Sequence, residues 1–241
     1  MLPGLVTDSL NHMSALKSSF VTGCWTVGSL ADAATLCRLA SMHAACDVVE
    51  CRVDCWPAAV PEALEALRSC PVPPLITVRG PDEGGRHCLT IADREALYRR
   101  FLPLAALLDI EIACLGDFRN LILEARERGV LVVASAHDFI RTPESGELRR
   151  KMESAIQGGA DIVKFAATAQ HSGDLATLAS LLEEPGHPPL SVMAMGPLGR
   201  VSRLLMARLG SVLNYGYLDA ATVPGQWPAA RLRELVMEIN T

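Results

Sequence analysis

The sequence predicts a single (β/α)8 TIM barrel, in which eight parallel strands form a closed ring inside a layer of helices. Two observations carry this prediction. Short apolar runs alternate with amphipathic stretches along the whole chain, which is the pattern of consecutive βαβ units. The chain has 241 residues, of which 50% are hydrophobic, so it has the length and the apolar side chains of one large core. We therefore expect one domain over residues 1–241, with about 1–19 as an N-terminal extension without an assigned role.

The strands are predicted at the short apolar runs of the sequence. In order, these runs lie at residues 20–26, 47–53, 74–79, 107–112, 130–136, 161–166, 190–195 and 212–215. Amphipathic periodicity predicts helices in the intervals, for example at 31–43, 61–69, 94–102, 117–128, 144–157 and 174–183. Eight strands in this length fit a closed barrel better than an open sheet, which usually has fewer strands. No Gly-x-Gly-x-x-Gly motif follows the first strand, and this disfavours a dinucleotide-binding fold.

Composition and charge exclude several classes of protein. The 22 basic and 27 acidic residues give a net charge of −5, which offers no basic surface for nucleic acid. The most apolar stretch, 101–115, is interrupted by Pro103, Asp109 and Glu111, so we expect no membrane-spanning helix. The first twenty residues carry no basic cluster ahead of an apolar core, which disfavours a secretory signal. The sequence therefore predicts a cytoplasmic protein that binds neither nucleic acid nor membrane.

The eight cysteines all lie in the first half of the chain, and none of them forms a Cys-x-x-Cys pair. Most stand within apolar runs, where a free cysteine packs as a small hydrophobic side chain. We expect buried, reduced thiols rather than a metal or redox site.

Polar residues interrupt the predicted strands at alternate positions. Successive strand residues face opposite sides, so the polar members of one parity point into the barrel. Active sites of barrels lie at the C-terminal ends of the strands. Two readings stay open for these inward groups: an ion-pair network, such as Glu50 with Arg52 or Arg79, or a functional site. They are Glu50, Arg52, Asp54, Thr77, Arg79, Asp109, Glu111, Ser135 and His137.

Lys164 is the most informative of the inward groups. Only three lysines occur, at positions 17, 151 and 164, and only Lys164 lies inside an apolar strand, at 162–166. Burial and neighbouring arginines disfavour the charged form of a lysine. A neutral amine in that position forms a Schiff base with a carbonyl substrate, and we favour this role over a structural lysine.

His137 and Glu83 are candidates for proton transfer. His137 ends the fifth predicted strand, where an imidazole can act as a general acid and base. The loop at 79–86 can bring Glu83 over the mouth of the barrel, and its alternative reading is an ordinary exposed turn.

Two segments near the C-terminus are candidates for ligand binding. The segment 195–203 predicts a strand end that runs into a helix start, where backbone N–H groups with Arg203 or Arg200 make an anion site. The segment 222–226 contains Pro and Gly, and it predicts either a loop that closes over a ligand or a flexible surface loop.

Taken together, these segments resemble type I 3-dehydroquinate dehydratase, the Schiff-base enzyme of the shikimate and quinate pathways. The resemblance extends over residues 20–230, and the histidine segment, the lysine strand and the closing Pro-Gly-Gln are its specific parts. The matching segments are 50–54, 77–79 with 83–85, 109–111, 137–139 with 142–143, 159–164, 193–196 with 199 and 202–203, and 224–226.

The resemblance implies a role for each candidate residue. Lys164 is implied as the nucleophile, His137 as the proton shuttle and Glu83 as the group that orients His137. The substrate carboxylate is implied to pair with Arg203. The remaining residues implied to hold the substrate are Glu50, Arg52, Arg79, Thr222 and Gln226, with Thr222 where the family often has serine. Thr168 and Ala169 replace a Met-Pro pair common in the family, which bears on the shape of the pocket.

The implied activity is the dehydration of 3-dehydroquinate to 3-dehydroshikimate, by a homodimer without a metal or other cofactor. Two alternatives remain: a lysine-dependent class I aldolase, and a catalytically silent barrel that binds a small anionic ligand. The sequence leaves open whether the enzyme serves biosynthesis or quinate breakdown.

Overall fold

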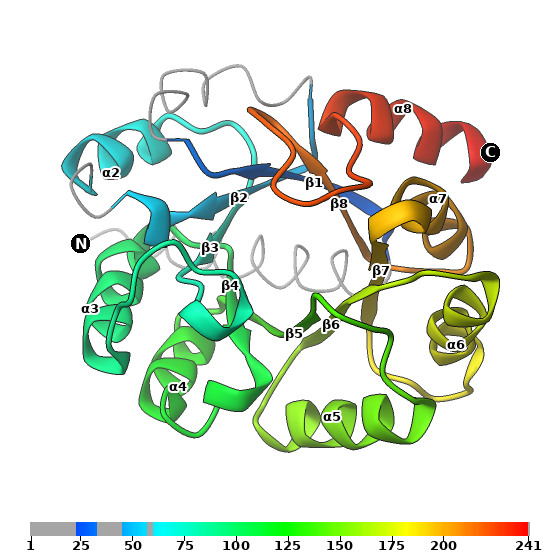
Figure 1. Cartoon of the computed structure of the whole chain (residues 1–241). Helices are drawn as coiled ribbons and strands as arrows, with labels where there is room; N and C mark the ends of the chain where they lie inside the picture. The colour runs from blue at the N-terminus through cyan, green and yellow to red at the C-terminus, as the bar shows by residue number, and fades with distance from the viewer. Residues whose placement is uncertain (1–22, 33–44, 57–59, 241) are drawn as a thin grey trace, which may run out of the picture.

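The eight strands form a barrel with the helices outside it, as predicted (Figure 1). This computed structural model describes residues 23–32, 45–56 and 60–240. All strand pairs are parallel, in the order β7-β6-β5-β4-β3-β2-β1-β8. The strands are β1 (Trp25–Leu30), β2 (Val48–Arg52), β3 (Pro74–Thr77), β4 (Leu107–Glu111), β5 (Leu131–Asp138), β6 (Ile162–Thr168), β7 (Leu190–Met195) and β8 (Leu213–Tyr217).

The helices follow the strands in sequence and form the outer layer (Figure 1). They are α2 (Val60–Arg68), α3 (Ile91–Phe101), α4 (Arg119–Glu127), α5 (Ser145–Gln157), α6 (Ser172–Glu183), α7 (Gly199–Arg208) and α8 (Ala229–Asn240). Five of the predicted helices match α2 to α6, and the helix start predicted near 199 is that of α7. The predicted helix at 31–43 lies almost entirely outside the described residues, and α8 was not among the predicted helices.

The position predicted for the first strand is wrong. Its described part runs from Trp25 to Leu30 rather than ending at residue 26, and positions 20–22 lie outside the described residues. Gly28 and Ser29 look like a turn in the sequence, but both are required inside the strand. A Cβ atom on Gly28 would lie 2.8 Å from Leu218 and 2.9 Å from Cys46, so only glycine fits there. Ser29 faces the interior, where its hydroxyl donates a 2.5 Å hydrogen bond to Glu50.

The ring closes between β7 and β8 without a strand ladder. The backbone N–H of Val212 donates to the carbonyl of Leu190 at 2.8 Å, and the Ser191 hydroxyl donates to the carbonyl of Leu213 at 2.6 Å. The Ser211 hydroxyl accepts from the N–H of Val192 at 3.1 Å. Serine side chains at this seam satisfy backbone groups that a regular ladder would otherwise pair.

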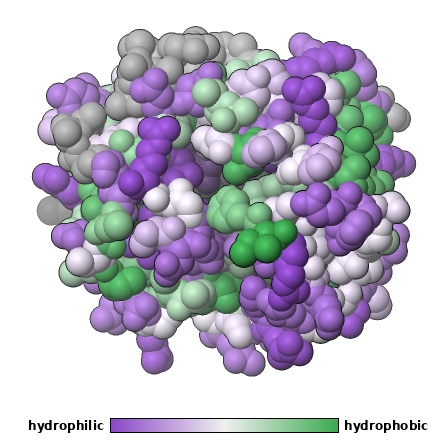
Figure 2. Space-filling view, in the orientation of Figure 1, coloured by the Kyte–Doolittle hydropathy of each residue, from purple (hydrophilic) through white to green (hydrophobic). Residues whose placement is uncertain are grey.

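Two apolar layers build the core. One lies between the strands and the helices, and the other fills the barrel interior from strand residues such as Val27, Leu75, Leu107 and Ile162. The face of the molecule seen in Figure 2 carries hydrophilic side chains mixed with apolar areas. Within residues 23–32, 45–56 and 60–240, no helix combines the length and the hydropathy needed to cross a membrane.

The cysteine prediction holds for only some of the thiols. Seven cysteines lie in the described residues; Cys46 and Cys51 are buried, whereas Cys24 and Cys88 are exposed and the other three are half-buried. Cys37 lies outside the described residues. Burial raises the pKa of the Cys51 thiol, which makes it an inert packing group.

Candidate active site

Lys164 lies on β6 inside the barrel, with only 3% of its surface exposed. Its Nζ atom lies 2.9 Å from Oδ2 of Asp109 and 3.8 Å from Oε1 of Glu50. The same atom lies 4.0 Å from the centroid of the Tyr215 ring. The expectation that arginines surround this lysine is therefore wrong. Two carboxylates and an aromatic face contact the nitrogen, and both kinds of group stabilise positive charge on it.

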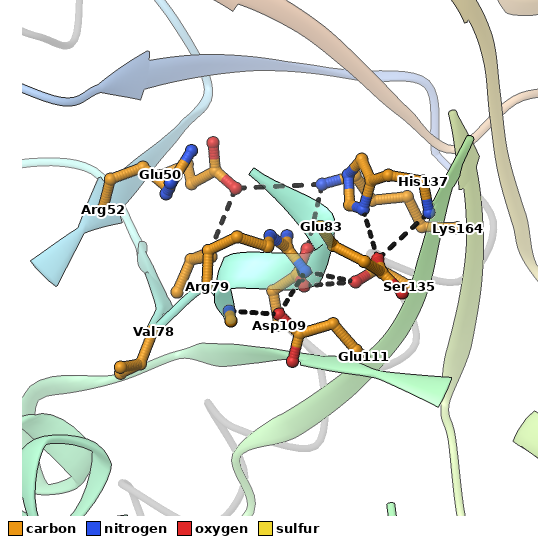
Figure 3. A network of polar contacts seen from close by, with 12 residues as sticks. Glu50, Arg52, Val78, Arg79, Glu83, Asp109, Glu111, Ser135, His137 and Lys164 are labelled. Carbon is orange, nitrogen blue, oxygen red and sulfur yellow. Dashed lines mark hydrogen bonds and ion pairs between the residues drawn. The ribbon is translucent and has the colours of Figure 1, made fainter. Parts of the chain in front are cut away.

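Asp109 connects Lys164 to a chain of buried ion pairs (Figure 3). Its carboxylate accepts from Arg79 at 2.8 Å and from the Ser135 hydroxyl at 2.6 Å. Burial opposes ionisation of this carboxyl, but the charges of Arg79 and Lys164 outweigh it and lower the pKa of Asp109 below its usual value. Asp109 is thus a fixed negative charge beneath the lysine.

Arg79 lies in the middle of this chain. Its Nη1 atom donates to Ser135 at 2.8 Å and to Glu111 at 3.1 Å, and Glu111 also pairs with Arg94 of α3. The inward ion-pair network predicted from the strand pattern is therefore present, but with other partners than the Glu50–Arg52 or Glu50–Arg79 pairs we expected. Arg79 lines the cavity, yet most of its terminal N–H groups bond to protein carboxylates and a hydroxyl, so few remain for a ligand.

His137 and Glu83 form a hydrogen-bonded pair at the mouth of the barrel (Figure 3). Oε2 of Glu83 lies 2.8 Å from Nδ1 of His137 and accepts from its backbone N–H at 3.0 Å. Burial, together with the nearby charges of Arg79 and Lys164, lowers the pKa of His137 well below its ordinary value. Burial raises the pKa of Glu83 to about 7. With Glu83 ionised, Nδ1 donates to it, and Nε2 keeps a lone pair that can accept a proton.

The loop predicted to bring Glu83 over the barrel does so. Phe139 follows His137 and stacks on its ring, with 6.2 Å between centroids and an interplanar angle of 15°. Arg52 ties this loop to β2, because its Nη2 atom donates to the carbonyl of Gly84 at 3.1 Å and pairs with Asp54 at 2.8 Å. The imidazole of His137 therefore contacts the Phe139 ring and Glu83, and the loop that carries Glu83 is bonded to Arg52.

Glu50 of β2 is the second carboxylate near the nitrogen of Lys164. Its carboxylate accepts from the hydroxyls of Ser29 at 2.5 Å and Thr77 at 3.0 Å. These bonds fix its position while it lines the cavity.

Arg203 of α7 is a buried cation that lines the cavity. Its guanidinium donates to four backbone carbonyls at 2.8 to 2.9 Å, those of Ala194, Gly199, Tyr215 and Gly225. Among the described residues no carboxylate pairs with it, and burial lowers its pKa to about 10. A cation that is only 2% exposed and has no counter-ion favours an anionic ligand beside it. Arg200, the alternative at this position, is exposed and stacks on Trp227 instead, 4.9 Å from the ring centroid.

The segment 222–226 forms an ordered loop beside Arg203. The Gln226 side-chain oxygen accepts from the backbone N–H of Thr222 at 2.7 Å, and Gln226 lines the cavity. Gly225 has φ of +83°, and a Cβ atom there would lie 2.6 Å from the carbonyl oxygen of Gly196 and 2.8 Å from Cα of Gly199. The loop can approach the start of α7 only with glycine there.

Many of these groups line one cavity of about 180 Å³, which is a volume for a small molecule, whereas Asp109, Ser135 and Glu111 lie behind its lining. Apolar side chains of Ala166, Met193, Met195 and Val223 complete its walls. Each of the nine candidate residues predicted from the sequence lines it: Glu50, Arg52, Arg79, Glu83, His137, Lys164, Arg203, Thr222 and Gln226. Across the described part of the chain, no cluster of three His, Cys, Asp or Glu side chains is arranged to hold a metal ion.

Comparison with known proteins agrees with this arrangement. A family model for type I 3-dehydroquinase matches residues 24–240. This chain belongs to the type I 3-dehydroquinase family. It is 34% identical over 177 residues to the catabolic 3-dehydroquinate dehydratase of Acinetobacter baylyi, a match that covers 70% of this chain and 64% of that protein.

Two further relatives cover more of their own length. The 3-dehydroquinate dehydratase of Latilactobacillus sakei is 31% identical over 205 residues, which cover 80% of this chain and 83% of that protein. The crystal structure of 3-dehydroquinate dehydratase from Geobacillus kaustophilus matches with a TM-score of 0.82 at 25% identity, over 91% of this chain and 92% of that one.

Three positions depart from the pattern expected of a type I 3-dehydroquinase, and only one of them reaches the cavity. Thr222 lines it, so the additional methyl group relative to serine lies beside the ligand space. Thr168 and Ala169 are buried outside the cavity lining, where the Thr168 carbonyl accepts from the Thr142 hydroxyl at 2.9 Å. Of the three departures from the 3-dehydroquinase pattern, only Thr222 therefore lines the pocket.

Sequence reasoning missed several groups of the site, among them Arg94 and Tyr215. Arg94 lies on a helix, and nothing in its local sequence signals that it pairs with Glu111 in the interior. Tyr215 was predicted only as the last residue of the eighth strand, and its neighbour Lys164 is 51 positions away in the sequence. A period-two reading of β8 would have placed Tyr215 on the inner face with Leu213.

Proposed function

We propose that this type I 3-dehydroquinase dehydrates 3-dehydroquinate to 3-dehydroshikimate through a Schiff base on Lys164. The observation that carries this proposal is the convergence of Lys164, His137 and Arg203 on one small cavity. The buried amine supplies a nucleophile, the imidazole a proton shuttle, and the unpaired guanidinium a partner for a carboxylate.

The reaction begins at the amine. Once Lys164 has given up a proton, Nζ attacks the C3 carbonyl carbon of the substrate and water leaves, which forms a protonated imine. Nε2 of His137 then takes a proton from C2, and the electron pair moves toward the imine nitrogen to give an enamine. His137 returns a proton to the C1 hydroxyl, which departs as water. Hydrolysis of the imine restores the amine and releases 3-dehydroshikimate.

Arg203 and the loop at 222–226 orient the substrate. Arg203 is held by carbonyls that carry no full charge, so a substrate carboxylate is the counter-ion that this buried cation lacks. The amide of Gln226 and the hydroxyl of Thr222 are donors for the substrate hydroxyls on the same wall. Glu50 and Arg52 face the hydroxyls from β2, and Arg79 contributes mainly by holding Asp109.

Trapping of the covalent intermediate tests this proposal. Incubation with 3-dehydroquinate and sodium borohydride should give a reduced adduct in the intact mass of the protein, and Lys164→Ala should abolish both the adduct and the formation of the enone. Lys151→Ala is the matched control, because Lys151 lies on α5, away from the cavity lining, and pairs with Glu147. His137→Ala should still form the adduct, but its turnover should fall by about 10²- to 10⁴-fold.

The outcomes separate the alternative functions. An adduct accompanied by carbon–carbon cleavage, without formation of the enone, would indicate a class I aldolase. Absence of both adduct and turnover would leave the catalytically silent barrel.

We also propose that the protein is a single-domain homodimer of the cytoplasm that serves biosynthesis or quinate breakdown. The family resemblance supports the dimer, and free thiols such as the buried Cys51 support a reducing compartment. Light scattering coupled to gel filtration measures the oligomeric state.

A further inference from the structure

Tyr215 occupies a position that the proposed mechanism does not yet use. It lies on β8, whereas Lys164 lies on β6, and β7 separates the two strands. The tyrosine ring therefore reaches across the interior to bring its face to 4.0 Å from Nζ. Only 4% of Tyr215 is exposed, and the ring packs in the inner apolar layer with Met193 and Met195. The position of the ring is thus fixed by packing on its other sides.

Unlike the two carboxylates near this nitrogen, the ring of Tyr215 does not need an N–H group on Nζ for its interaction. Asp109 at 2.9 Å and Glu50 at 3.8 Å are acceptors that an ammonium group, with three N–H donors, can serve together. A protonated imine keeps one N–H, so it can serve only one carboxylate. Attraction between a cation and a ring face needs no N–H group. The contact with Tyr215 therefore persists through imine formation, when a hydrogen bond must be given up.

The hydroxyl of Tyr215 is not what makes this contact. It is buried and has no hydrogen-bond partner in the described part of the chain. The ring face, and not the phenol oxygen, is the part of the side chain that is engaged with Lys164.

We propose that the ring of Tyr215 is a catalytic group that keeps the imine nitrogen on Lys164 protonated. This inference rests on the proposed Schiff-base function. The protonated imine is the electron sink for removal of the C2 proton, and a neutral imine withdraws electrons far less strongly. The charged and titratable groups that face the nitrogen are Asp109 of β4 and Glu50 of β2, with His137 of β5 and Arg79, just after β3, farther out.

The expected effect is a change in pH dependence. In Tyr215→Leu the imine nitrogen loses its proton more readily, so the alkaline limb of kcat should move to lower pH by about 0.5 to 1.5. Above that limb, kcat should fall by about 3- to 30-fold relative to the unmodified protein. Tyr215→Phe keeps the ring and should keep the position of the limb.

Borohydride trapping provides a readout besides turnover, because hydride adds to the protonated imine. The adduct fraction is measured by intact mass from pH 7 to pH 10 for the unmodified protein, Tyr215→Leu, Tyr215→Met and Tyr215→Phe. As the pH is raised, the adduct yield should begin to fall at a lower pH in the Leu and Met variants than in the unmodified protein and in Tyr215→Phe. Tyr217→Leu, at a ring on the same strand that does not line the cavity, controls for general damage to β8. Tyr215→Met has a long, flexible side chain and keeps the test available if the Leu variant does not fold.

The results distinguish the two proposals. No adduct on the unmodified protein at any pH would overturn the proposed function itself. An adduct whose pH dependence is the same in the unmodified protein and in either ring-less variant would overturn only the role of Tyr215. A shift in Tyr215→Phe as large as in Tyr215→Leu would assign the effect to the hydroxyl and also refute the inference.

Discussion

Glu83→Gln should make this protein more stable and less active, and the size of the stability gain should depend on pH. The pKa of Glu83 lies at about 7, above its ordinary value of 4.5, mainly because burial disfavours the carboxylate. Glutamine keeps an oxygen that accepts from Nδ1 and from the backbone N–H of His137, so the two hydrogen bonds survive the substitution.

Glu83 ionises at a lower pH in the unfolded chain than in the folded protein, and this decides how the free energy of unfolding changes with pH. Between pH 4.5 and about 7 the unfolded chain ionises Glu83 while the folded protein does not, so the free energy of unfolding falls with rising pH over this window. The loss is complete above pH 7 and amounts to about 3 kcal/mol. Glutamine does not titrate, so the variant does not suffer this loss. The substitution should therefore stabilise the fold by up to about 3 kcal/mol at pH 8 and by much less at pH 4.5.

Urea unfolding of both proteins at pH 4.5, 6, 7 and 8 measures this difference. The acid limb of kcat/KM near pH 7 should disappear in the variant, and kcat should fall by about 10- to 100-fold because His137 loses the negative charge beside it. A stability difference that does not change with pH, or a variant that is less stable at pH 8, would refute the assignment of the raised pKa to burial of this carboxyl.

Three other changes test separate parts of the site. Arg203→Gln should raise KM by about 10- to 150-fold, since a charged hydrogen bond to the ligand is worth about 1.5–3 kcal/mol; steady-state kinetics measure it, and an unchanged KM would contradict the anion site. Asp109→Asn should lower the free energy of unfolding by about 3–5 kcal/mol because it leaves Arg79 and Lys164 without their shared carboxylate, and a midpoint in urea equal to that of the unmodified protein would speak against the network. Treatment with a chelator followed by gel filtration should leave kcat unchanged if the lysine imine alone activates C2, and strong inhibition would count against the imine mechanism.

The strand pattern predicted the inner face of the barrel well. A period of two assigned Glu50, Asp109 and Lys164 to the interior, and the structure places all three there. The pattern could not say which inward groups meet, because partners across a barrel are distant in sequence. For this reason Lys164 was expected beside arginines, whereas it contacts Asp109, and Arg79 contacts that aspartate from the other side.

The first strand shows a second limit of sequence reasoning. A glycine inside a strand reads as a break, unless one knows that another backbone or side chain passes close to it. At Gly28 the neighbours that forbid a side chain are Cys46 and Leu218, which come from elements 18 and 190 positions away. Tertiary packing, not local propensity, sets the end of this strand.

The four carbonyls around Arg203 also bear on how the specificity of this enzyme can be altered. The guanidinium joins β7, α7, β8 and the closing loop, and it is also the cation that faces the cavity. A substitution of Arg203 changes the anchorage of the loop and the charge of the site together. A preference for a ligand of different charge therefore cannot be obtained by changing this residue alone. Adaptation to a different substrate is easier at Thr222 or Met193, where side chains line the cavity without holding the surrounding backbone together.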